Sequence, residues 1–467
     1  MKSAEQPSYY KLCSGVKLRG YQVVSRVVYY RYSVSADALS ESELDLLSLC
    51  DGRHKLENTP LLRQLLGRNL IEPCEKNSQN EEWQNYRYCD NRYFPTAEIS
   101  ITGKCGFKCR HCFNAEDNFP QTDELSQEEL LSLLAQFDEC GIHAIEITGG
   151  EPLIHPFFPG LIREIAKRGM NLFELVTTAH HITEELLDEL NMLELKPMFK
   201  ISYDGIDHHD WFRKCPGAEE RLLKNIELIK SKGFRIRIHM NSYRGNAEKI
   251  LLTALLCDRL GVDIIQAIRT SEAPRLKGSD INDKCFTIDE YYEFGLKLIK
   301  EFIEAGGNNT IDIWQFLYTE PKSKTYSLKT LKCNAEDYRD NLPVCRRNRS
   351  KLTISSDGAL VPCMPMSGLM KKCGINYGNV KTSSVKELLT YSPYLEKVCT
   401  TVGELKRQNK KCAECPYWKV CAGGCRVIGL MLSDGDYMAP DEAKCIFWNK
   451  YFRRTTEMMD NLGYSRA

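Results

Sequence analysis

The chain of 467 residues lacks a long apolar run and lacks an excess of charge of either sign. No stretch of 18 or more apolar residues occurs, and the start, MKSAEQPSYYKLCSG, lacks the apolar segment of a secretory signal. We therefore expect a cytoplasmic protein without membrane spans. The 63 basic and 63 acidic side chains cancel, which argues against a surface built for nucleic acid or an anionic membrane.

Cysteine, in contrast, is abundant. The sequence has 21 cysteines, and because cytosolic reductants keep thiols reduced, such a density indicates metal binding rather than disulfides. One group has the spacing C-x3-C-x2-C and comprises Cys105, Cys109 and Cys112. A second group near the C-terminus has the pattern C-x12-G-x4-C, a gap, C-x2-C-x5-C-x3-C, a gap and a last cysteine.

Between the two groups, short runs rich in β-branched residues alternate with amphipathic helical patterns. Six runs predict strands, at 97–102, 143–148, 171–178, 197–204, 234–240 and 262–268. Ser126 and Glu129 form a predicted capping box at the start of the first helix. Six β/α units in series predict an α/β fold in which parallel strands form a partial, open (β/α)6 barrel.

The first cysteine group follows the first predicted strand, at the end of the barrel where such folds carry their chemistry. Three thiolates on a cubane cluster of four irons and four sulfides leave one iron open to an external chelate. A zinc site with three thiolates is the alternative.

A C-x3-C-x2-C motif after the first strand of a partial barrel resembles the radical S-adenosylmethionine (SAM) superfamily. The resemblance implies that SAM chelates the open iron through its amino and carboxylate groups. It also implies an electron donor of the flavodoxin or ferredoxin type. Reductive cleavage of SAM then yields a 5′-deoxyadenosyl radical that abstracts hydrogen from the substrate.

Several further residues match SAM contacts of that superfamily. The turn after the second strand, in IEITGGEPL, would bring its backbone and a carboxylate to the SAM amino group. The segment KISYDGIDHHDWFR resembles a motif near the polar atoms of SAM, and His111 stands where relatives often have an aromatic residue. The residues that the resemblance assigns to SAM are His111, Gly149, Gly150, Glu151, Ser202, Asp204 and Arg221.

The C-terminal pattern resembles the SPASM extension, which houses two auxiliary 4Fe-4S clusters, so the resemblance implies three clusters in all. The inner auxiliary cluster would be bound by Cys345, Cys363 and Cys425, and the outer by Cys412, Cys415, Cys421 and Cys445. Cys333 is a candidate fourth ligand of the inner cluster, and an open iron that binds a substrate thiol is the alternative. A zinc knuckle remains a further interpretation of the C-x2-C pair.

Residues 1–92 resemble the small winged-helix, PqqD-like domain that recognises the leader peptides of ribosomally made natural products. The predicted helix SESELDLLSLCDG is acidic, which disfavours DNA binding. A leader peptide would add as a strand to the exposed sheet edge, and a purely structural cap is the alternative. We expect domain boundaries at 1–92, 93–315 (barrel) and 316–467 (SPASM).

The sequence therefore predicts a radical SAM/SPASM maturase that modifies a precursor peptide, with a thioether or carbon-carbon crosslink as the favoured product. One alternative is the anaerobic oxidation of a protein side chain, as in sulfatase maturation. Another is a non-enzymatic iron-sulfur regulator or electron carrier, which would have no use for Gly149, Gly150 and Glu151.

Overall fold

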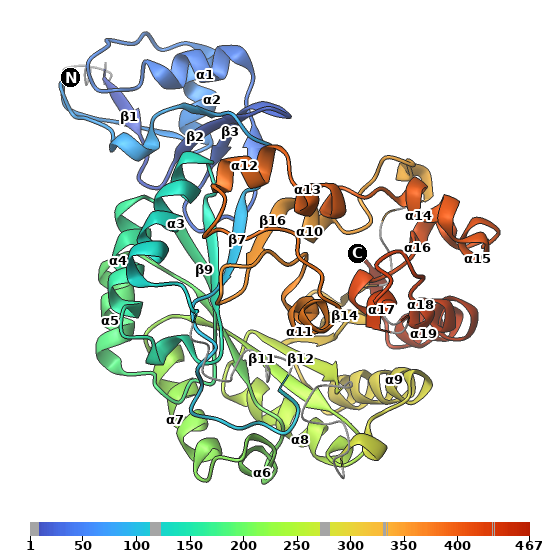
Figure 1. The fold of residues 1–467 in the computed structure, drawn as a ribbon. Coiled ribbons are helices and arrows are strands. Elements are labelled where there is room, and N and C mark those ends of the chain that lie inside the picture. The colour runs from blue at the N-terminus through green and yellow to red at the C-terminus, as the bar shows by residue number, and fades with distance from the viewer. Residues whose placement is uncertain are drawn as a thin grey trace.

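A computed structural model describes residues 9–112, 123–270, 281–329, 333, 335–431, 433 and 435–467. Along the chain, a small N-terminal region packs at one end of a central barrel-like sheet, and the C-terminal region lies beside the open side of that sheet (Figure 1). None of the helices in these residues is long and apolar enough to cross a membrane.

The N-terminal region contains two small sheets and two helices. In the larger sheet the strand order is β4-β3-β2-β6, and β1 pairs with β5 in the smaller one. The strands are β1 (Tyr10–Leu12), β2 (Lys17–Tyr21), β3 (Val24–Tyr29), β4 (Ala36–Ala38), β5 (Ile71–Pro73) and β6 (Arg87–Cys89), and the helices are α1 (Glu41–Ser48) and α2 (Pro60–Gly67). Ser40 and Glu43 form a capping box at the start of α1.

The central sheet contains the six predicted parallel strands: β7 (Thr96–Ser100), β8 (Ala144–Thr148), β9 (Asn171–Thr177), β10 (Met198–Ser202), β11 (Arg235–Ser242) and β12 (Ile264–Arg269). The helices that alternate with them are α3 (Gln127–Glu139), α4 (Phe158–Lys167), α5 (Glu184–Met192), α6 (His209–Arg213), α7 (Ala218–Ser231), α8 (Ala247–Arg259) and α9 (Ile288–Glu304). The α/β fold class with a largely parallel sheet is thus confirmed.

The helices and strands form where local chemistry favours them. The predicted capping box is present, since Ser126 accepts from the Glu129 amide and Glu129 accepts from the Ser126 amide. Apolar residues of β7–β12 and the inner faces of the helices share one buried core, which includes Ile99, Ile147 and Phe199. Burial of this apolar surface is the main source of stability of the barrel.

The sheet extends beyond the six predicted strands at both edges. At one edge β13 (Thr310–Ile313) pairs in parallel with β12, followed by β14 (Leu317–Glu320), β15 (Thr325–Leu328) and β17 (Ser465–Arg466). At the other edge β16 (Lys351–Ile354), from the C-terminal region, pairs in parallel with β7. A turn around Asp357–Gly358 follows β16, and the Val361 amide donates to the Thr353 carbonyl across it.

The rest of the C-terminal region consists of short helices and loops. Part of it packs around a separate small core that includes Val361 and Trp418, whereas Leu389, Tyr394 and Met459 belong to the core of the barrel. The helices are α10 (Arg346–Ser350), α11 (Ser367–Lys372), α12 (Val385–Thr390), α13 (Pro393–Val398), α14 (Val402–Gln408), α15 (Lys410–Ala413), α16 (Trp418–Cys421), α17 (Arg426–Met431), α18 (Glu442–Ile446) and α19 (Phe452–Asn461).

A layer of buried charges connects β16 and α10 to the interior of the barrel. Glu98, Glu146 and Glu174 occupy matching register positions on β7, β8 and β9. Lys200 on β10 donates to Glu146 at 2.9 Å and to Glu174 at 2.8 Å. From the C-terminal region, Lys351 pairs with Glu98 and Glu146, and the Arg347 guanidinium donates to Glu146 at 3.1 Å.

Burial alone would raise the pKa of Glu146, but Lys200, Lys351 and Arg347 outweigh it and hold that pKa well below its ordinary value. Glu146 therefore stays ionised, and its charge is compensated from both regions of the chain. The layer stabilises the closed arrangement only while each charge has its partner.

Replacement of Lys351 by Met should destabilise the fold by about 3–5 kcal/mol, because it leaves Glu98 and Glu146 buried beside one positive charge fewer. The thermal unfolding midpoint of the purified protein measures this. Lys224→Met, which removes an exposed ion pair with Glu220, is the matched control and should leave the midpoint nearly unchanged. Equal midpoints for the two variants would contradict a stabilising role of the layer.

Candidate active site

The first cysteine group lies on the loop after β7, at the carboxyl end of the central sheet. Cys105, Cys109 and Cys112 pack in one small cluster with Phe107 and Ala218. Burial raises the pKa of Cys105 to about 12. In the part of the chain that the structure describes, no three His, Cys, Asp or Glu side chains are placed to hold a single metal ion.

Donors reach the sulfurs of this group. The Phe107 amide donates to the Cys105 sulfur at 3.4 Å, and the Arg213 guanidinium donates to the Cys109 sulfur at 3.6 Å. Hydrogen bonds to thiolate sulfur offset the negative charge that thiolates bring to an iron-sulfur cluster. Donors to two of the three sulfurs fit the predicted cluster.

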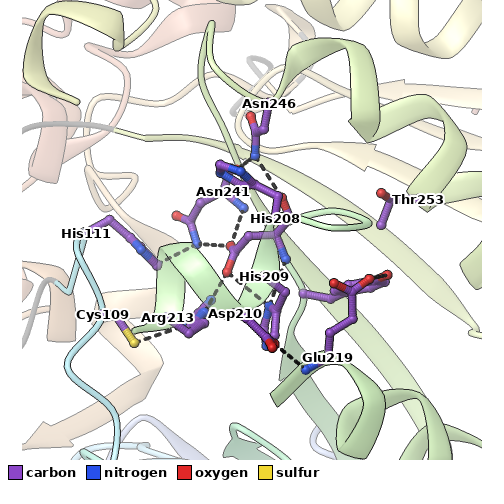
Figure 2. Close-up of polar contacts among 12 residues, drawn as sticks. Cys109, His111, His208, His209, Asp210, Arg213, Glu219, Asn241, Asn246 and Thr253 are labelled. Atoms are coloured by element: carbon purple, nitrogen blue, oxygen red, sulfur yellow. Dashed lines mark hydrogen bonds and ion pairs between the residues drawn. The ribbon is translucent and has the colours of Figure 1, made fainter. Parts of the chain in front are cut away.

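A buried polar network supports this loop from the side of β10 and β11 (Figure 2). Asp204, fully buried, accepts from the Arg213 guanidinium at 2.6 Å and from the Asn241 backbone and side-chain amides at 3.2 and 3.1 Å. Burial alone would raise the pKa of Asp204, but the Arg213 guanidinium outweighs burial and holds that pKa well below its ordinary value. Asp204 and Arg213 therefore form an ion pair in the folded protein.

His111 belongs to the same network. Its ring stacks on Phe212 with centroids 4.1 Å apart. Its Nε2 lies 2.9 Å from the Asn241 side-chain amide (Figure 2). Burial lowers the pKa of His111 to about 3, so the ring is neutral and accepts from Asn241. The adjacent Nδ1 is buried without a partner among the described residues.

The turn after β8 packs directly on the start of the cysteine loop. A Cβ added to Gly149 would lie 2.5 Å from the Thr102 carbonyl oxygen, and one added to Gly150 would lie 2.2 Å from the Lys104 carbonyl oxygen. Only glycine permits this approach of two backbones. Gly150 and Glu151 also donate their amides to Thr102 and Lys104, at 2.7 and 2.9 Å.

Glu151 is buried, and both of its carboxylate oxygens are engaged at the end of β9. It accepts from the Thr177 hydroxyl at 2.7 Å and from the Thr178 amide and hydroxyl at 2.7 and 2.6 Å. In this arrangement Glu151 positions the loops after β8 and β9 relative to each other. Its predicted contact with SAM stays a prediction.

Ser202 and Arg221 lie further out. Ser202 is the last residue of β10, in register with His239 of β11. Arg221 is exposed on the first turns of α7 and lines a hollow of about 570 Å³ with His180, Pro216 and Asn225. Their roles as SAM contacts stay predictions, like those of Asp204 and His111.

The later residues of the segment KISYDGIDHHDWFR mainly hold the loop together. Asp210 accepts from the Gly217 and Glu219 amides at 2.5 and 2.7 Å and so fixes the start of α7, and the Asp204 amide donates to His209 Nδ1 at 3.3 Å. Sequence reasoning missed Asn241 and Asn246, which complete the network from β11 and the loop after it. Their position at the carboxyl end of a predicted strand was the available signal.

Cys412, of the predicted outer set, shares the small core of the C-terminal region with Cys363 and Cys425, of the predicted inner set. Burial first, and Cys415 among the nearby charges, raise the pKa of Cys412. Burial, followed by Asp441 with a smaller contribution from Cys445, raises the pKa of Cys421 to about 12. The assignment of Cys412, Cys415, Cys421 and Cys445 to one outer cluster stays a prediction.

The predicted inner set, Cys345, Cys363 and Cys425, comes from three separate segments of the C-terminal region. Burial raises the pKa of Cys363, and Cys425 is among the neighbours that add to the shift. Cys345 precedes α10 and Cys363 precedes the short helical turn Met364–Met366, so both flank the region that docks on the barrel. The Cys333 thiol donates to the Lys419 carbonyl at 3.2 Å, and its part as a fourth ligand stays a prediction.

Comparison with known proteins identifies two domains. Residues 99–251 match the model of the radical SAM superfamily, and residues 345–416 match that of the SPASM iron-sulfur cluster-binding domain. The chain thus contains a radical SAM domain and a SPASM domain, as predicted.

Individual relatives are distant. The chain is 27% identical over 366 residues to an AdoMet-dependent heme synthase of Oleidesulfovibrio alaskensis, covering 74% of this chain and 86% of that one. It is 22% identical to the antilisterial bacteriocin subtilosin biosynthesis protein AlbA of Bacillus subtilis, covering 72% of this chain and 67% of that one. The crystal structure of Streptococcus suis SuiB bound to precursor peptide SuiA has the same fold, with a TM-score of 0.64 and 16% identity over 93% of this chain and 99% of SuiB.

The Asp204–Arg213 pair predicts a specific pH dependence of stability. The pKa of Asp204 is lower in the folded than in the unfolded protein, so the stabilisation is complete above the unfolded pKa, about 3.9, and is lost as the pH falls toward the folded one. Asp204→Asn should lower the thermal midpoint at pH 7, and the gap to the wild type should narrow toward pH 3. Asp188→Asn, at an exposed ion pair, should leave the midpoint unchanged at both pH values. A gap for Asp204→Asn that is constant with pH would contradict the assignment.

Proposed function

We propose that this protein is a peptide-modifying radical SAM enzyme whose substrate is a ribosomally made precursor peptide. Cys105, Cys109 and Cys112 would hold a 4Fe-4S cluster, which when bound supplies reductive cleavage of SAM. The two C-terminal cysteine sets would hold two further clusters. A thioether or carbon-carbon crosslink is the product that we favour.

The fold of the N-terminal region is the observation that most supports a peptide substrate. Residues from 93 onward are about 80% of the chain, so a structural match over 93% to SuiB includes part of the first 92 residues. SuiB was crystallised with its precursor peptide. The shared fold supports a peptide partner for this chain as well.

The N-terminal sheet offers one open edge for such a peptide. No described strand pairs with the outer side of β4, whereas β6 at the opposite edge lies by the barrel, where the Arg87 side chain donates to Asp138 of α3 at 3.0 Å. The Leu39 amide donates to the Arg26 carbonyl, so these two residues form a hydrogen-bonded pair. In antiparallel strands, hydrogen-bonded residue pairs alternate with pairs that exchange no hydrogen bond, so Ala38 and Ala36 belong to the second kind. Ala36 and Ala38 therefore direct their amides and carbonyls away from β3, toward the open edge.

A second candidate function is a SAM-dependent step of heme synthesis. It is favoured by the sequence identity to the heme synthase, 27%, which is higher than the 22% identity to AlbA. This candidate gives no role to the open edge of β4. The two functions are separated by whether a peptide binds that edge and stimulates SAM cleavage.

The first test concerns SAM cleavage itself. Anaerobically reconstituted, reduced protein should convert SAM to 5′-deoxyadenosine, and Cys109→Ser should abolish this, because the cluster loses a thiolate. Chromatography of the nucleoside products measures it, with Cys13→Ser in the N-terminal region as the control that retains activity. Absence of the product in the iron-loaded wild type would refute the radical SAM reaction.

The second test concerns the peptide. Ala38→Pro removes one outward amide without removing a bond to β3, so it should weaken binding of a labelled precursor peptide, encoded by a neighbouring open reading frame, at least tenfold. Ala38→Val keeps the amide and should bind as the wild type does. Fluorescence anisotropy measures the affinity, and equal binding by both variants would exclude the β4 edge as the docking site.

A further inference from the structure

The turn between β13 and β14, Trp314–Phe316, places a glutamine in an unusual backbone conformation. Gln315 has φ +59°, in the left-handed region where glycine is the usual residue. The turn is nevertheless firmly held: the Lys444 ammonium donates to the Gln315 carbonyl, and the Tyr291 hydroxyl donates to the Trp314 carbonyl at 3.2 Å. A side chain at this position therefore has a fixed direction.

That direction is toward the second cysteine group. The Gln315 side-chain amide donates to the Cys425 sulfur at 3.0 Å. The Cys425 backbone amide donates to Asp441 at 2.8 Å, and Asp441 also accepts from the Lys444 amide at the start of α18. Gln315, Cys425, Asp441 and Lys444 thus form a closed ring of hydrogen bonds between the end of the barrel sheet and the C-terminal region.

From this ring we infer that Gln315 is a positioning residue that raises the reduction potential of the inner auxiliary cluster through its hydrogen bond to Cys425. The inference rests on the proposed function, which makes Cys425 a ligand of that cluster. Reduction adds negative charge to the cluster and its sulfurs, and a donor aimed at a ligand sulfur stabilises the reduced form more than the oxidised form. Neither family resemblance nor the cysteine pattern points to Gln315.

The left-handed turn separates the side-chain effect from the backbone effect. Gln315→Leu removes the amide and keeps a side chain of similar size in the same conformation. Gln315→Gly removes the amide and relieves the backbone conformation. If the hydrogen bond sets the potential, the two variants shift it equally, and Gln315→Gly also guards against a folding defect in Gln315→Leu.

A redox titration of the fully loaded protein, followed by electron paramagnetic resonance, tests the inference. At a fixed solution potential, both variants should show about a tenfold lower ratio of reduced to oxidised inner cluster. This corresponds to a reduction potential lower by about 59 mV for a one-electron couple. The signal that Cys425→Ser removes identifies the inner cluster. The outer cluster, on Cys412, Cys415, Cys421 and Cys445, is the internal control and should keep its potential.

The outcomes distinguish the inference from the proposed function on which it rests. An inner-cluster potential unchanged in both variants would overturn the role of Gln315 while leaving the ligand set intact. A shift in only one variant would also overturn it, because a shift in Gln315→Gly alone would assign the effect to the relaxed backbone and a shift in Gln315→Leu alone would assign it to the introduced leucine. If the Cys425→Ser variant keeps every cluster signal of the wild type, the ligand set itself is refuted, and the inference with it.

Discussion

The buried charge layer inside the barrel is the constraint on which the rest of the structure depends. Glu146 is compensated by Lys200 from the barrel and by Lys351 and Arg347 from the C-terminal region, so neither region satisfies this charge alone. Because an unpaired buried charge costs several kcal/mol, the two regions must dock in one arrangement. Six β/α units leave a barrel open, and β16 joins its free edge beside β7.

This docking also places the cysteines. Cys345 immediately precedes α10, which carries Arg347, and Cys363 follows the hairpin that begins with β16. The charge layer therefore positions two of the proposed inner ligands relative to the barrel. At the far end of the parallel strands, the turn between β13 and β14 contacts Cys425, so the proposed inner set is approached from two distant parts of the sheet.

The sequence predicted what local pattern and spacing determine. The six strands, the capping box at Ser126 and the two domain families agree with expectation. It could not predict contacts between segments far apart in the chain, such as the pairing of β16 with β7 across more than 250 residues or the engagement of Glu151 by Thr177 and Thr178. Asp204 lies in a segment that resembles a SAM-contacting motif. Its observed partners, Arg213 and Asn241, could not be predicted because they depend on how loops converge in space.

The central claim is that Cys105, Cys109 and Cys112 leave one iron of a cluster open for SAM. The most direct measurement is the electron paramagnetic resonance spectrum of the reduced, iron-loaded protein before and after SAM is added, recorded on a variant in which serines replace the C-terminal cysteine ligands. The account predicts a 4Fe-4S signal that changes when SAM binds. A spectrum unaffected by SAM, or zinc in place of iron at this site, would contradict it.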